Sequence, residues 1–115
     1  MFDCQVSYII CLVYGHLTIT VTWAYHFDTE APDYTVDPAW LQRVSDVVDM
    51  VLERDMYVLV NVHHDSWTWA DVTQASANYT QIEDKFYRLW YQIGTKLACK
   101  SSFLAYEPIN EPPGT

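Results

Sequence analysis

The sequence predicts an α/β fold in which about three parallel strands are joined by crossover helices. Short apolar runs rich in β-branched residues, typical of strands buried on both faces, alternate with longer segments whose apolar residues recur at helical spacing. Conspicuous polar residues follow each apolar run. No run is followed by GxGxxG or GxxxxGKS/T, the usual signals of dinucleotide and nucleotide binding. A doubly wound sheet and a slice of a barrel both fit this pattern.

The first half of the chain contains two predicted strands and one helix. A strand near residues 17–22 has the least support. Asp37 and Pro38 form a typical helix start, as N-cap and first-turn residue. Apolar residues at helical spacing then predict a helix over 38–55. The apolar run that follows predicts a strand over 57–62.

The second half repeats the same order of elements. A polar and aromatic loop is expected over 63–78. Thr80 and Glu83 have the spacing of a capping box, and the apolar stripe behind them predicts a helix over 80–98. A last apolar run predicts a buried strand over 103–109.

Length and composition are typical of one modest globular unit. The chain has 115 residues, of which 50% are hydrophobic, which is too apolar for a disordered chain. Its net charge is −9, from 15 acidic and 6 basic residues. This excess of acid argues against binding to nucleic acid phosphates and suits a protein that acts on neutral molecules.

The cysteines and the start of the chain carry no clear signal. Cys4, Cys11 and Cys99 form an odd set without CxxC spacing, so we expect unpaired buried thiols. The apolar run at residues 6–13 lacks a basic flank and a small-residue cleavage site, so it is not interpreted as a signal peptide. It is also too short to span a membrane.

The candidate functional residues lie just beyond the predicted strands. They are Trp23 and His26 after the first, His63, His64 and Trp67 after the second, and Asn110 and Glu111 after the third. In a (β/α)8 barrel, the loops after successive strands converge on one rim, which holds the active site. A carboxyl group beside an amide, as in Asn110–Glu111, suits proton donation to a glycosidic oxygen, although a solvated turn is the alternative for so short a motif.

The histidine pair and the tryptophans each allow two interpretations. His63, His64 and Asp65 superficially suggest a metal site, but three adjacent residues that leave a strand converge poorly on one point, so no metal is expected. Neighbouring strand residues point to opposite sides, so the two histidines should have different roles. Trp23 and Trp67 offer flat apolar surfaces for sugar rings, with ordinary packing as the alternative.

Four blocks in order, at 21–26, 34–44, 56–65 and 107–112, together resemble glycoside hydrolase family 5, particularly its cellulases of the endo-β-1,4-glucanase type. The resemblance implies a partial (β/α)8 TIM barrel, because a complete one needs about 250 residues. Residues 21–115 would be a fragment of the catalytic barrel that ends after the fourth-strand Asn-Glu-Pro motif, with residues 1–20 unassigned.

The resemblance also implies roles and a reaction. Glu111 would be the general acid/base, Asn110 would bond the sugar 2-hydroxyl, His63 would join the polar network of the catalytic subsite, and His64 would contact sugar hydroxyls. The parent protein would hydrolyse β-linked polysaccharide, such as cellulose or a related β-glucan or mannan, with retention of configuration. The family's nucleophile lies on a later strand.

Two further points follow from the family pattern. Thr18 and Thr20 occupy positions where the family normally has an arginine and a proline, so the support that this arginine gives the nucleophile is absent. The expected partner is a β-linked oligo- or polysaccharide, with no cofactor, nucleic acid or membrane, and the family is mostly extracellular. The alternatives are a catalytically dead fragment that at most binds carbohydrate and an unstable chain without function.

Overall fold

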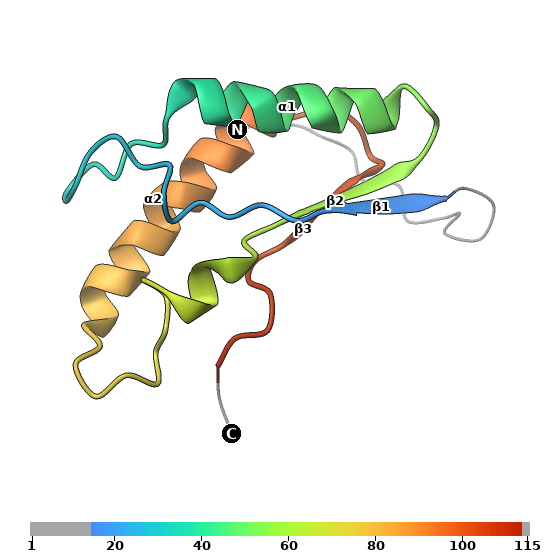
Figure 1. Cartoon of the computed structure of the whole chain (residues 1–115). Helices are drawn as coiled ribbons and strands as arrows, with labels where there is room; N and C mark the ends of the chain where they lie inside the picture. Colours follow the sequence, from blue (N-terminus) through green and yellow to red (C-terminus); the bar gives the residue numbers. More distant parts are fainter. Residues whose placement is uncertain (1–14, 114–115) are drawn as a thin grey trace.

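The structure is a computed structural model that describes residues 15–113 (Figure 1). Cys4, Cys11 and the apolar run at residues 6–13 lie outside the described residues. The elements in chain order are β1 (His16–Ile19), α1 (Pro38–Leu52), β2 (Tyr57–Asn61), the 3-10 helix η1 (His64–Trp67), α2 (Tyr79–Leu97) and β3 (Leu104–Glu107).

The described strands form one parallel sheet in the order β1-β2-β3. Thr18 is paired with Leu59, and Asn61 with Glu107. All the strands run in the same direction, and β2 continues directly into η1 (Figure 1). The predicted α/β fold with three parallel strands and crossover helices is therefore confirmed.

Both predicted helices are present, with small differences at their ends. The Asp37 side chain caps α1 by accepting a hydrogen bond from the Ala39 N–H at 2.8 Å. The residue that caps α2 is Asn78, whose Oδ1 accepts from the Gln81 N–H at 3.1 Å, so Thr80 lies inside the helix rather than at its start. Neither helix in the described part of the chain has the length and apolar character needed to cross a membrane.

The core lies between the helices and one face of the sheet. Alternate residues of the central strand, Val58 and Val60, are fully buried, and Val62 just beyond it is too. They belong to one cluster with apolar residues of α1 and α2, and α1 lies along the sheet in Figure 1. Because strand side chains alternate, Leu59 and Asn61 point to the opposite face.

The third strand differs from its prediction. We expected a buried strand, but β3 is an edge strand of the described sheet and Tyr106 is 41% exposed. Apolar side chains of β3 therefore stay partly exposed, because no neighbouring strand lies beyond it in the described sheet.

The prediction of unpaired buried thiols is wrong for Cys99. This residue is exposed and disulfide-bonded, and it has a left-handed backbone conformation with φ of 56°. Sequence spacing could not reveal the bond, because disulfide pairing depends on which cysteines the fold brings within reach.

Candidate active site

Backbone hydrogen bonds continue the sheet beyond the formal strand ends. The His63 N–H donates to the Val21 carbonyl, and the Asn110 N–H donates to the Val62 carbonyl, each at 2.8 Å. The chain segments that follow all three strands are thus joined side by side. This brings the histidine pair and the Asn110–Glu111 pair to the same end of the sheet.

Asn61 is the centre of the polar network at this end. Its side chain is fully buried, and its Oδ1 accepts from the Val21 N–H at 3.1 Å. Its Nδ2 lies 2.7 Å from Oε2 of Glu107 and 3.1 Å from Nδ1 of His63. Sequence reasoning did not single out Asn61, although the position of one amide inside an otherwise apolar run was a usable signal.

The two histidines do not point to opposite sides as predicted. Their rings lie edge to face, with centroids 4.5 Å apart. The alternation rule fails because β2 ends at Asn61 and His63 already has helical backbone angles, with φ of −92° and ψ of −74°. His64 is exposed, and its Nδ1 lies 2.9 Å from Oγ1 of Thr22.

Asp65 fixes the loop that follows the histidines. Its side chain is fully buried, and its two oxygens accept from the Trp23 N–H at 3.0 Å and from Nε1 of Trp69 at 2.7 Å. The carboxylate thus ties the chain after β1 to the chain after β2. Within residues 15–113 no cluster of three or more His, Cys, Asp or Glu side chains is arranged to hold a metal ion.

Lys85 of α2 secures the same loop from the other side. Its ammonium lies 4.3 Å from the ring centre of Phe27 and 4.8 Å from that of Trp69, which are cation–π distances. Burial lowers the pKa of Lys85, while the charges of Glu30 and Asp65 act to raise it. Trp69 is therefore a packing residue held between a cation and a carboxylate.

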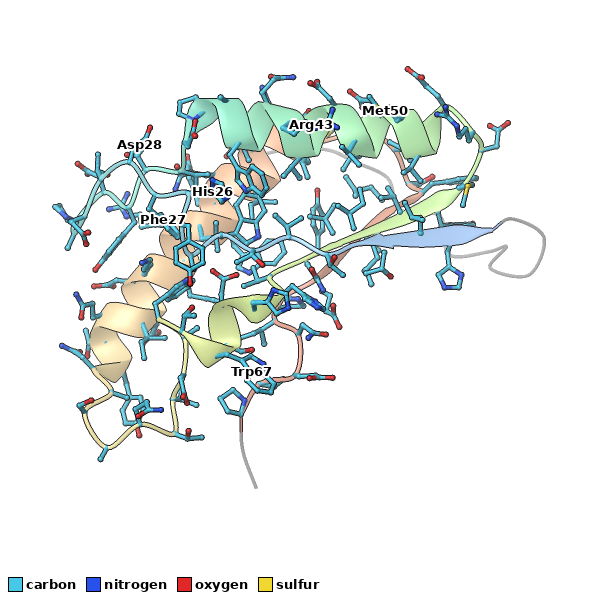
Figure 2. The ribbon with its side chains drawn as sticks, in the orientation of Figure 1. His26, Phe27, Asp28, Arg43, Met50 and Trp67 are labelled. Carbon is cyan, nitrogen blue, oxygen red and sulfur yellow. The ribbon has the colours of Figure 1, made fainter. Side chains whose placement is uncertain are left out.

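The other aromatic residues predicted to bind substrate differ in burial. Trp23 is fully buried in the core and donates from Nε1 to the Asn61 carbonyl at 3.1 Å, which favours ordinary packing, the alternative interpretation, over stacking on a sugar. His26 lies flat against Trp40 of α1, with ring centroids 3.7 Å apart. Trp67 is 69% exposed, and Figure 2 shows it low in the view beside η1, whereas His26 lies higher, near α1.

Hydrogen bonds hold the backbone of Asn110, directly before Glu111, at both its N–H and its carbonyl. The Asn110 N–H donates to Val62, and the Asn110 carbonyl accepts from Oγ of Ser66 at 2.9 Å. Glu111 is exposed and has a φ of 41°, a left-handed conformation that costs a non-glycine residue about 1 kcal/mol. Such strain is found preferentially at functional sites.

Residues 14–115 match the family model described as cellulase (glycosyl hydrolase family 5). The chain belongs to this family. The resemblance inferred from four sequence blocks is thereby confirmed, and the parallel sheet corresponds to part of the family's barrel.

Individual members of the family are also similar to the chain. Endoglucanase B of Paenibacillus lautus is 37% identical over 99 residues, which are 86% of this chain and 17% of the relative. The structure of a tri-modular endo-β-1,4-glucanase from Bacillus licheniformis, complexed with cellotetraose, shares 40% identity with a TM-score of 0.76 and covers 83% of this chain and 18% of that one.

A third relative is described as specific for another glycan, xyloglucan. A xyloglucan-specific endo-β-1,4-glucanase from a metagenomic library, in complex with cellotriose, is 31% identical with a TM-score of 0.76 over 84% of this chain and 28% of its own. The described fold is thus that of family 5 enzymes, while the chain spans less than a third of each of these relatives.

Proposed function

We propose that the enzyme to which this chain belongs hydrolyses β-linked glucan with retention of configuration, with Glu111 as the general acid/base. Asn110 bonds the 2-hydroxyl of the sugar beside the scissile bond. His63 belongs to the polar network of the catalytic subsite, and His64 contacts sugar hydroxyls. Trp67 supplies a stacking surface for a pyranose ring.

The observation that carries this proposal is the placement of Asn110–Glu111 at the end of a sheet whose central strand leads into the histidine pair. Glu111 protonates the glycosidic oxygen as the bond from that oxygen to the anomeric carbon breaks. A second carboxylate, about 5 Å from the first, attacks the anomeric carbon and forms a glycosyl ester. Water deprotonated by Glu111 then hydrolyses this ester, and the configuration is retained.

The relatives and the charge support the proposed substrate class. Two of them are endo-β-1,4-glucanases whose structures contain cellotetraose and cellotriose. A net charge of −9 does not favour an acidic glycan. We therefore place a neutral β-1,4-linked glucan backbone, plain or branched, in the site.

The chain context and the location of the protein complete the proposal. Residues 21–115 form part of a longer catalytic barrel that supplies the nucleophile from a later strand. The disulfide at Cys99 supports an oxidising, extracellular location, because such bonds are rare in reducing compartments.

The test is the Glu111→Gln substitution in the complete protein that contains this chain. Turnover of β-1,4-glucan should fall at least 100-fold, whereas formation of the glycosyl ester from an aryl glycoside with a dinitrophenol leaving group, which needs no protonation, should persist. Asp28→Asn, at an exposed carboxylate, is the control and should retain full activity. Unchanged glucan turnover by Glu111→Gln would refute the assignment.

Binding of glycan without cleavage is the second candidate, and the exposure of Trp67 is the observation that favours it. A protein of this kind would bind cellotetraose and release no reducing sugar. The same assay on the wild type separates the two functions, since hydrolysis that depends on Glu111 excludes a binding-only role.

A further inference from the structure

The orientation of the Asn61 amide is determined by its partners. A backbone N–H can only donate, so the Asn61 atom that faces the Val21 N–H at 3.1 Å must be the oxygen. The amide nitrogen therefore faces Glu107 and His63. Its distance of 2.7 Å to Oε2 of Glu107 agrees with this, because a carboxylate oxygen needs a donor there.

The same reasoning fixes the proton on His63. Nδ2 of Asn61 carries two hydrogens and no lone pair for a hydrogen bond, so at 3.1 Å it donates to Nδ1 of His63. A neutral imidazole that accepts at Nδ1 carries its proton on Nε2. We propose that Asn61 is a positioning residue that holds His63 as the Nε2–H tautomer and turns this N–H toward the candidate active site.

The placement of the network supports a role at the site. Asn61 and Glu107 are register partners on the face of the sheet opposite the helix-covered core. In the described part of the chain, no hydrogen bond engages Nε2 of His63, so its N–H is available to a ligand. This step rests on the proposed function: in the active site, the Nε2–H of His63 donates to an oxygen of the glucan or of the attacking carboxylate.

Glu107 and Asn61 act on His63 in different ways. Glu107 contacts the amide rather than the imidazole, and it occupies one of the two amide hydrogens. The other hydrogen is thereby directed to Nδ1 of His63. The tautomer should depend on the donor at position 61 and not on the charge at position 107.

The adjacent histidine provides an internal control. Nδ1 of His64 faces Oγ1 of Thr22 at 2.9 Å, and a hydroxyl can either donate or accept. Its tautomer is therefore not determined by the same argument. Substitution of Thr22 should leave the His63 ring unchanged.

The experiment is a long-range proton–nitrogen correlation spectrum of the ¹⁵N-labelled full chain at about pH 8, above the ordinary histidine pKa. The wild type should show His63 with an unprotonated Nδ1 and a protonated Nε2. In Asn61→Asp, an acceptor oxygen replaces the amide donor of similar shape, so Nδ1 should become protonated. Glu107→Gln and Thr22→Val should both retain the wild-type His63 pattern.

A wild-type His63 protonated at Nδ1 would overturn the proposal, and so would an Nδ1 that stays unprotonated in folded Asn61→Asp. If that variant does not fold, the wild-type pattern and its persistence in Glu107→Gln still decide the matter. Because no glycan enters the measurement, its result stands apart from the Glu111→Gln assay. Failure of one does not imply failure of the other.

Discussion

Asp65 provides the sharpest test of how the site loop is held. Its two oxygens accept from the Trp23 N–H and from Nε1 of Trp69, and the side chain has no exposed surface. Asp65→Ala removes both acceptors at once. Water from bulk solvent has no direct access to replace them.

The expected cost follows from these two bonds. A buried donor left without a partner costs about 1–3 kcal/mol, so two donors give roughly 2–6 kcal/mol. Relief of the cost of burying a charge offsets part of this. We therefore expect Asp65→Ala to lower the free energy of unfolding by about 3 kcal/mol, which is a large share of the 5–15 kcal/mol typical of a domain. Asp65→Asn keeps one acceptor and should lose about half as much.

Urea unfolding followed by tryptophan fluorescence measures these differences as shifts in the midpoint at constant slope. Asp28→Ala is the matched control, because that carboxylate is exposed, and it should change the free energy of unfolding by less than about 0.5 kcal/mol. A loss below about 1 kcal/mol for Asp65→Ala would refute the reasoning. It would mean that the loop is held by its aromatic packing alone.

Other perturbations separate packing from function. Trp23→Ala should cost about 3–5 kcal/mol in urea unfolding, because the ring is fully buried. Trp67→Ala should change stability by less than about 0.5 kcal/mol and weaken binding of cellotetraose in calorimetry. Equal losses of stability for Trp23→Ala and Trp67→Ala would contradict the difference in burial between the two side chains. Burial lowers the pKa of Lys85 from its ordinary 10.5, so wild-type stability should rise as the pH rises toward 10.5, and Lys85→Met should remove this rise in urea midpoints. Cys99 should resist alkylation until a reductant is added, as peptide mass spectrometry would show; labelling without reductant would exclude the disulfide.

Hydrophobic periodicity was sufficient to predict the order of the elements. The runs around Val58–Val60 and the stripe of α2 are long enough to outweigh local ambiguity, and the structure places both in one core. The ends were less predictable, because capping depends on single side chains. Asn78 and Thr80 are both good N-caps by type, and only the backbone geometry selects Asn78.

The placement of the candidate residues at one end of the sheet was predictable, but the orientation of their side chains was not. The rule that ligand-binding residues follow parallel strands led to His63 and Asn110. Their backbone N–H groups donate to the carbonyls of Val21 and Val62, which places both residues at the same end of the sheet. Which aromatic is exposed was not predictable, since Trp23 and Trp67 both follow strands. The difference arises from tertiary contacts, because Trp23 lies over the core while Trp67 ends a short 3-10 helix on the surface.

The strained backbone conformation of Glu111 is stabilised by a chain of contacts that begins in the core. Trp23 is buried and anchors Asp65, which lies in η1. The next residue of this helix, Ser66, donates to the Asn110 carbonyl, directly before Glu111. This carbonyl hydrogen bond is worth about 1 kcal/mol, similar to the cost of the left-handed conformation at Glu111, so loss of the Ser66 contact would let the backbone relax. A tryptophan buried in the core thus helps to hold the carboxylate that we propose protonates the glycosidic oxygen.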